Sequence, residues 1–243
     1  MGIVRMGPPT ELLVQLRDEY ELRDFIETGT YYGGTAAWAA SYFDRVTTIE
    51  YSRQIYEEAL HRYGKIQNID FILGDSRVVL KTVVPRLSNR AIFWLDSHWS
   101  GGQTYGAHDE SPLMDEIGTL RMAKCTHFLF IDDARLFASP PPRHHHMDEW
   151  PSIDQVIRAI KSCNDEYYIV IIEDVIVAVP TYAKQLVGNY CQEISTKAWE
   201  EYGERLTESH VRQGCRLIGQ GLLRIGFGLR VNLRLLTSRL VEN

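Results

Sequence analysis

The sequence lacks a long hydrophobic run, a paired-cysteine motif and an excess of basic residues. No stretch reaches the roughly 18 uninterrupted apolar residues that span a bilayer, so we expect no transmembrane segment. The first residues, MGIVRMGPPT, contain no apolar core of a signal peptide. The four cysteines stand far apart, which predicts neither a zinc knuckle nor a disulfide framework and suits a cytoplasmic protein.

Charge and composition narrow the class of protein further. The formal net charge is −6, which argues against general nucleic-acid binding, because such proteins usually carry a basic surface. Hydrophobic residues make up 44% of the chain and charged residues 24%, so a sizeable core is expected. A length of 243 residues suits either one large α/β domain or a domain with an appendage.

Short apolar strands alternate with helical segments along most of the chain. A helix is expected at residues 11–21, before the first strand. The expected strands are 23–28, 45–50, 69–73, 91–95 and 127–131, and the expected helices after them are 33–43, 52–63, 76–87, 112–122 and 153–162. Such alternation predicts a parallel, doubly wound sheet.

The last two strands follow a different pattern. The run YYIVIIEDVIVAVP at 167–180 contains two apolar stretches that are separated only by Glu173-Asp174. No crossover helix fits between them, so they must pair as an antiparallel hairpin. We therefore predict an α/β, Rossmann-like, doubly wound sheet of seven strands that ends in an antiparallel hairpin.

Three regions are expected: an N-terminal helix at 1–22, the α/β domain at 23–180 and a C-terminal extension at 181–243. The extension begins with a helical pattern at 182–209. Polar and apolar residues then alternate over 224–235, which favours an extended segment over a helix and predicts packing or homo-oligomerisation. Its arginines either dock on an anionic lipid or acidic partner or form a solvated face; they are Arg212, Arg216, Arg224, Arg230, Arg234 and Arg239.

A glycine-containing motif, ETGTYYGGT at 27–35, links the first strand to its helix. Glycine permits a sharp turn and close approach of a ligand, and a helix N-terminus offers unpaired N–H groups. Packing alone is the alternative explanation for these glycines. The residues of this motif predicted to bind a cofactor are Glu27, Thr28, Gly29, Tyr31, Gly33 and Thr35.

Two further strand ends carry suitable polar residues. Glu50 ends the second strand, next to Tyr51, and a carboxylate there can accept both hydroxyls of a ribose. Gly74, Asp75 and Ser76 end the third strand, where a short polar side chain can reach an adenine edge. In a doubly wound sheet the ligand lies beyond these carboxyl ends, so these residues extend the predicted cofactor site.

The three motifs ExGxxxGGT, IE and GDS, in that order, resemble the class I S-adenosylmethionine (SAM)-dependent methyltransferases over about residues 23–179. The resemblance implies SAM as the cofactor. Tyr31 stands where the commoner ExGxGxG motif has its second glycine. The spacing here is closer to that of the catechol O-methyltransferase-like enzymes, which favours O-methylation of a small molecule.

Acidic residues at the ends of the fourth and fifth strands form a second group, Asp96, Asp132 and Asp133. Three close carboxylates repel one another unless a cation neutralises them, and oxygen ligands suit Mg²⁺ or another divalent ion. Catechol- and macrocin-type O-methyltransferases, which this part of the chain resembles, carry metal-binding acids at these strand ends. The alternative is that these acids only cap loops.

His98 is the predicted catalytic base, together with Asp96, which is also expected to lie at the cofactor. The sulfonium methyl of SAM is already activated, so the enzyme has to align the reactants and remove a proton from the acceptor. An imidazole with an unperturbed pKa of about 6.5 suits that role. A structural histidine without a catalytic role is the alternative.

Two loops complete the predicted site. His108, Asp109 and Glu110 either touch the substrate or metal or are solvated, and the loop at 140–150 is expected to line the acceptor pocket through Arg143 or one of His144, His145 and His146. The acceptor is expected to be a small molecule or carbohydrate. Alternatives are a metal-independent O- or N-methyltransferase, a non-catalytic module that keeps the fold, and an NAD(P)-binding oxidoreductase.

Overall fold

The computed structural model describes residues 7–99, 109–164, 166–207 and residue 218. The predicted extended segment at 224–235, the arginines of the tail and His108 lie outside these residues. The chain divides into two compact units, Met1–Cys191 and Gln192–Asn243. The boundary expected at residue 180, like oligomerisation through the extension, stays a prediction.

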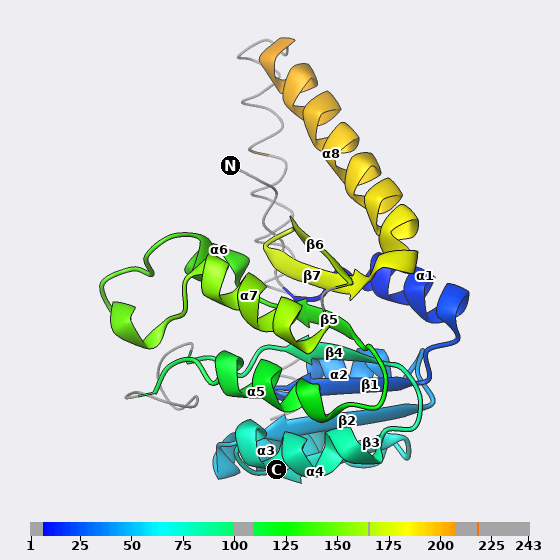
Figure 1. The fold of residues 1–243 in the computed structure, drawn as a ribbon, viewed down its shortest axis with the longest axis vertical. Coiled ribbons are helices and arrows are strands. Elements are labelled where there is room, and N and C mark those ends of the chain that lie inside the picture. Colours follow the sequence, from blue (N-terminus) through cyan, green and yellow to red (C-terminus); the bar gives the residue numbers. More distant parts are fainter. Residues whose placement is uncertain (1–6, 100–108, 165, 208–217, 219–243) are drawn as a thin grey trace, which may run out of the picture. The chain divides into compact units, whose positions relative to one another are not determined.

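The first unit is built on one seven-stranded sheet with the order β3-β2-β1-β4-β5-β7-β6 (Figure 1). All neighbours pair in parallel except β7, which runs antiparallel to β5 and to β6. The strands are β1 (Asp24–Thr28), β2 (Arg45–Glu50), β3 (Ile69–Leu73), β4 (Ala91–Leu95), β5 (Phe128–Ile131), β6 (Tyr167–Ile172) and β7 (Val175–Pro180). This order confirms the predicted fold class, including the terminal hairpin.

Helices follow most of the strands as predicted. They are α1 (Thr10–Tyr20), α2 (Gly34–Ala39), α3 (Arg53–Tyr63), α4 (Ser76–Val83), α5 (Leu113–Thr119), α6 (Ala134–Ala138), α7 (Ile153–Cys163) and α8 (Lys184–Thr207), with 3-10 turns η1 (Val84–Arg86), η2 (Leu120–Met122), η3 (Met147–Glu149) and η4 (Thr181–Ala183). Helix α4 ends earlier than predicted, because Pro85 lacks the N–H that a continuing α-helix needs. No helix in the described ranges is both long and apolar enough to cross a membrane.

The helices cover two faces of the sheet. On one face, Ile26 and Phe93 belong to a core cluster with Leu80 of α4, Ile117 of α5 and Val156 of α7, and Figure 1 shows these three helices in a row. Successive strand side chains point to opposite faces, so the neighbouring residues pack on the other side.

Aromatic contacts hold α1 and α2 against that second face. Phe25 of β1 lies 5.2 Å from Phe43 and 6.3 Å from Trp38 between ring centroids. Tyr20 of α1 lies 5.4 Å from Phe128 of β5. Both faces of the sheet are therefore covered, which explains the continuous apolar runs of β4 and β5.

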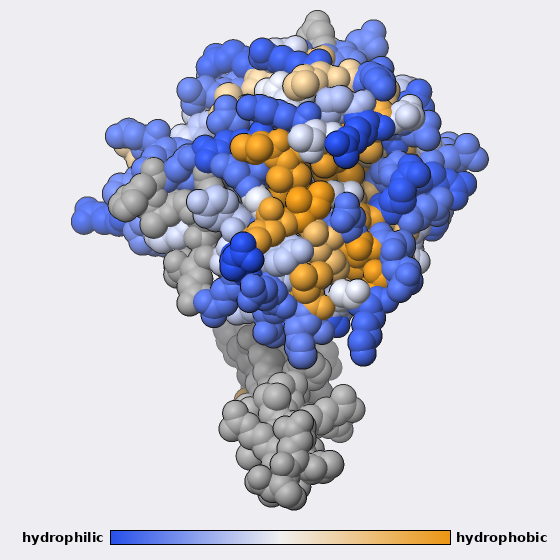
Figure 2. All heavy atoms as spheres, turned by 90° about the horizontal axis from the view of Figure 1, so that it is seen from below, coloured by the Kyte–Doolittle hydropathy of each residue, from blue (hydrophilic) through white to orange (hydrophobic). Residues whose placement is uncertain are grey.

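Strand β3 forms one edge of the sheet and has no fully buried residue. Figure 2 shows this side of the molecule, where apolar side chains gather at the surface among hydrophilic ones; the exposed apolar residues of α3 and α4 include Leu60 and Val78. Asp70 is exposed in the middle of the strand. A charge at that position discourages pairing with another edge strand.

Candidate functional site

The turn after β1 requires glycine at position 29. Gly29 has φ +85°, and a Cβ atom there would lie 2.1 Å from the backbone oxygen of Asp96. Its N–H donates to the carbonyl of Ile49 at 2.9 Å, so β2 holds the turn in place. The first predicted glycine is therefore needed for both its backbone conformation and its close contact with the end of β4.

Two more residues of this turn adopt left-handed backbone conformations. Tyr31 has φ 48° and Gly33 has φ +80°. A Cβ on Gly33 would lie 2.9 Å from Cδ2 of Tyr63 on α3, which explains glycine at this position. Gly33 precedes α2, whose first N–H groups have no partner within the helix.

Glu50 lies at the end of β2, directly beside this turn. One carboxylate oxygen accepts the N–H of Tyr31 at 3.0 Å, and the other accepts the N–H of Ser52 at 2.8 Å. Burial raises the pKa of Glu50, although these backbone hydrogen bonds partly oppose the shift. The carboxylate is thus held in one orientation and keeps further lone pairs for the two hydroxyls of a ribose.

Glu27 lies deeper than the sequence indicates. It is 1% exposed, and its Oε2 accepts the hydroxyl proton of Thr48 at 2.5 Å, while Thr30 lies 2.6 Å from the same Thr48 oxygen. Burial raises the pKa of Glu27 to about 8, with further contributions from Asp96 and Glu50. Its direct partners are hydroxyl groups inside the fold, so Glu27 stabilises the turn through these buried hydrogen bonds.

We expect Glu27→Gln to stabilise the protein more at pH 8.5 than at pH 5. The folded carboxyl keeps its proton up to about pH 8, whereas the unfolded one loses it near 4.5, so wild-type stability falls as the pH rises between these values. A neutral amide removes this loss, which is of the order of a few kcal/mol. Urea unfolding at both pH values measures the difference.

The control for this measurement is Glu57→Gln, which changes an exposed carboxylate on α3. It should have nearly the same small effect at both pH values. An equal effect of Glu27→Gln at pH 5 and pH 8.5 would contradict a raised pKa.

Asp75, predicted to meet an adenine edge, caps α4. Its carboxylate accepts the backbone N–H of Arg77 at 2.9 Å and the Arg77 guanidinium at 2.8 Å. These hydrogen bonds with Arg77 lower the pKa of Asp75. The side chain is 23% exposed and caps the first turn of α4, and its contact with an adenine stays a prediction.

The acidic residues after β4 and β5 surround a histidine. Nε2 of His98 lies 2.5 Å from Oδ2 of Asp133, and Nδ1 lies 3.6 Å from Oδ1 of Asp96. Burial opposes the charged imidazole, but the hydrogen bond to Asp133 and the nearby carboxylates outweigh it and raise the pKa of His98. The imidazole therefore lies between Asp133 and Asp96, and these acidic groups favour its protonated form.

The three carboxylates do not form the predicted metal site. Oδ1 of Asp133 contacts Arg135 at 2.5 Å while its Oδ2 contacts His98, and Oδ1 of Asp132 accepts the N–H of Asp133 at 2.8 Å. Among the residues that the structure describes, no group of three acidic, histidine or cysteine side chains is arranged to hold a metal. His98 and Arg135 contact Asp133 where a divalent cation was expected. Burial and the neighbouring carboxylates still raise the pKa of Asp96 to about 8 and that of Asp132 to about 6.

A second ion pair links this cluster to the β6–β7 turn. Arg135, which holds Asp133, also pairs with the carboxylate of Asp174, whose Oδ1 accepts the backbone N–H of Arg135 at 2.9 Å. The carbonyl of Asp174 accepts the N–H of Ala134 at 2.7 Å. Asp174 and Glu173 form the hairpin turn with positive φ angles of 70° and 52°. The hairpin is thereby anchored beside the end of β5.

Glu116 of α5 is a buried carboxylate that sequence reasoning missed. It is 1% exposed, and its Oε1 accepts the hydroxyl proton of Ser97 at 2.6 Å. Burial raises the pKa of Glu116, and hydrogen bonds from Ser76 and Ser97 oppose the shift. Its position in an amphipathic helix, LMDEIGT, offers no local signal that this one acid faces inward.

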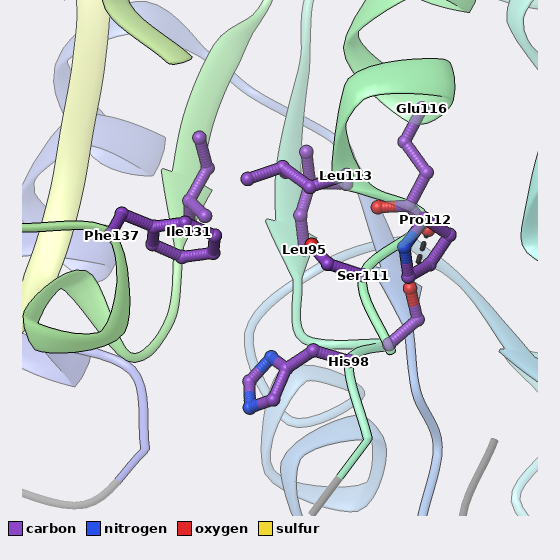
Figure 3. A pocket seen from close by; sticks show the side chains of 9 residues that line it. Leu95, His98, Ser111, Pro112, Leu113, Glu116, Ile131 and Phe137 are labelled. Carbon is purple, nitrogen blue, oxygen red and sulfur yellow. Dashed lines mark hydrogen bonds between the residues drawn. The ribbon is translucent and has the colours of Figure 1, made fainter. Parts of the chain in front are cut away.

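A small hollow lies between Glu116 and His98. It has about 190 Å³ of empty space, including the solvent at its mouth, and apolar walls that include Leu95, Ile131 and Phe137. Figure 3 shows the His98 imidazole at one side of this hollow, with Leu95 and Leu113 over it. A titratable group at an apolar hollow by the strand ends is the arrangement expected where an acceptor meets a cofactor.

Glu110 joins the two loops of the site. It is fully buried, and its carboxylate accepts hydrogen bonds from Nε1 of Trp150 at 2.6 Å and from the backbone N–H of His146 at 3.0 Å. His145 contacts the same carboxylate at 2.8 Å. These partners overcome the effect of burial and lower the pKa of Glu110.

This arrangement corrects the prediction for Glu110 as a solvated or substrate-contacting residue. The carboxylate connects the loop after β4 to the loop after β5, and the Trp150 ring then lies 5.5 Å from that of His98. His145 and His146 both contact the Glu110 carboxylate and so help to join the two loops. The acceptor contacts expected of Arg143 and His144 stay a prediction.

Several solved structures resemble this chain in fold. They include an SAH-bound methyltransferase from Podospora anserina (16% identity, 72% of this chain, 80% of that chain, TM-score 0.45), the N-methyltransferase NodS from Bradyrhizobium japonicum (16%, 70%, 90%, 0.44) and Aeropyrum pernix fibrillarin with natively bound S-adenosyl-L-methionine (14%, 65%, 66%, 0.43). No family model and no curated protein matches the chain. The order of the strands, with β7 reversed between β5 and β6, defines a class I methyltransferase fold.

Proposed function

We propose that the protein is a SAM-dependent methyltransferase. The observation that carries this proposal is Glu50, whose carboxylate is oriented by the N–H groups of Tyr31 and Ser52 beside the Gly29 turn. A carboxylate at that strand end binds ribose hydroxyls, and the turn admits the close approach of a cofactor. The bound cofactor supplies an activated methyl group.

The residues of this chain then align the acceptor and hold its proton. The walls of the hollow beside His98 are mostly apolar, which disfavours water next to the reacting atoms. Burial raises the pKa of Asp96 to about 8, so its ionised form is a stronger base than an ordinary carboxylate. The ionised form of Asp96 can accept the proton that a hydroxyl or amine loses on methylation, and His98, held by Asp133, lies beside it.

We further propose an acceptor that is a small molecule or carbohydrate, methylated on oxygen. The support is the small volume of the hollow and the ExGxxxG spacing of the turn. Methylation of nitrogen is the second candidate, because the same proton-accepting group serves an amine. A turnover assay with hydroxyl- and amine-bearing acceptors, followed by mass spectrometry, distinguishes the two.

Calorimetry with S-adenosylhomocysteine (SAH) tests the function. We expect SAH to bind the wild-type protein and Glu50→Gln to weaken binding about 10–100-fold, the effect of losing charged hydrogen bonds to the ribose. Glu57→Gln, an exposed change on α3, is the matched control and should bind as the wild type does. Binding of NAD(P) without binding of SAH would identify an oxidoreductase, and binding of neither would favour a non-catalytic module.

SAH binding and turnover, measured with EDTA and then with Mg²⁺ added back, test whether the protein requires a metal. Because His98 and Arg135 already neutralise Asp133, we expect SAH binding and turnover to be unaffected by EDTA. If EDTA abolished turnover and Mg²⁺ restored it, the metal-assisted mechanism would be supported instead.

A further inference from the structure

A second hollow lies at the opposite end of the sheet from the Gly29 turn. It holds about 470 Å³, including the solvent at its mouth, and is lined by η2, the end of α7 and the residues just before β5 and β6. His127, which immediately precedes β5, is one of the lining residues. The carboxyl ends of the parallel strands hold Glu50 and Asp96, so the two sites do not overlap.

His127 presents a buried donor in this region. Its side chain is 1% exposed, and Nδ1 accepts the backbone N–H of Ala91 at 3.1 Å, so the ring proton resides on Nε2. Burial lowers the pKa of His127 to about 4, which keeps the ring neutral at physiological pH. Nε2 has no hydrogen-bond partner among the described residues. A buried N–H without a partner is costly, and a ligand can supply the acceptor.

The other lining residues favour a negatively charged ligand. Among the described lining residues, Arg121 and Lys124 are the charged ones, and none is a carboxylate. Arg121 donates to Ser162 at 2.5 Å through one nitrogen, which leaves the rest of its guanidinium for a ligand. Burial raises the pKa of the thiols of Cys125 and Cys163, so these residues stay neutral.

We propose that this hollow binds a small oxyanion, a phosphate or carboxylate group carried by a metabolite. The Nε2–H of His127 and the cations of Arg121 and Lys124 are its ligands. Phosphate and carboxylate oxygens accept charge-assisted hydrogen bonds from such groups. This second site is independent of the methyltransferase site and of whether SAM binds.

Titration of the full chain with inorganic phosphate and, separately, with acetate tests the proposal. Histidine-labelled protein followed by ¹⁵N NMR should show a saturable shift of the His127 Nε2 resonance, with a Kd of about 1 mM for the preferred ion. The double variant Arg121→Gln/Lys124→Gln should weaken binding at least tenfold, about the loss of one charge-assisted hydrogen bond. The two titrations show which oxyanion the site prefers.

The variant His127→Asn tests the role of the Nε2 donor separately. The asparagine oxygen can replace Nδ1 as acceptor for Ala91 while the Nε2 donor is lost, so the variant should fold but bind weakly. Arg158→Gln removes an exposed cation of α7 that does not line the hollow, and it should bind as the wild type does. The proposal would be overturned if the His127 resonance did not shift with phosphate or with acetate, each at about 20 mM. It would also be overturned if Arg158→Gln weakened binding as much as Arg121→Gln/Lys124→Gln does.

Discussion

Replacing Gly29 by alanine is expected to abolish SAH binding and to lower the free energy of unfolding by about 3 kcal/mol or more. The new Cβ would lie 2.1 Å from the backbone oxygen of Asp96, and the backbone there has φ +85°. Asp96 cannot easily move away, because its N–H donates to the carbonyl of Thr28 at 3.0 Å. Urea unfolding and calorimetry with SAH measure the two effects.

Gly118→Ala is the matched control for this prediction. Gly118 lies in α5, and outside the backbone of its own helix and its two chain neighbours no atom of the described residues lies within 4 Å of a Cβ placed there. Alanine favours a helix by up to about 1 kcal/mol over glycine, so stability should be unchanged or higher, and SAH binding should persist. A Gly29→Ala protein that is as stable as Gly118→Ala would disprove the steric argument.

Replacing Asp174 by alanine is expected to cost about 2–3 kcal/mol of stability. The change removes the partner of the Arg135 guanidinium and of its backbone N–H, and the same guanidinium holds Asp133 against His98. The expected loss is smaller than for a fully buried pair, because the Arg135 side chain is 45% exposed. Thermal and urea unfolding measure this loss.

Two further variants separate the ion pair from the turn. Asp174→Asn keeps an oxygen acceptor and tolerates a positive φ, so it should recover part of the loss. Asp154→Ala breaks an exposed pair with Arg158 on α7 and should change stability much less than Asp174→Ala does. Equal losses in Asp174→Ala and Asp154→Ala would show that the link to Asp133 contributes nothing.

Much of the fold could be predicted because its signals are local. The run at 167–180 has no room for a helix, so its two strands had to form a hairpin, and the pairs Tyr167–Pro180 to Ile172–Val175 confirm this. Helix α6 was missed, since its five residues, ARLFA, are too few for a periodic pattern. Its location depends on Asp174, which is distant in the sequence.

The candidate site was predicted less completely. Gly29, Gly33 and Glu50 meet at one turn, as their positions at strand ends indicated. The sequence also suggested that Asp96, Asp132 and Asp133 converge, but it did not reveal that Arg135 would neutralise one of them. Charge partners of this kind depend on side-chain directions, which no spacing rule specifies.

The glycine turn between β1 and α2 illustrates what the sequence determines by itself. Backbone conformation and hydrophobic periodicity depend on neighbouring residues, so the alternation of strands and helices and the terminal hairpin follow from the sequence. Only the tertiary structure decided which groups each carboxylate contacts. Glu27 is buried against Thr48, Glu110 joins Trp150 to the loop after β4, and Asp133 binds His98. Whether an acid faces a ligand, a cation or the core depends on groups that only folding brings within a few ångströms.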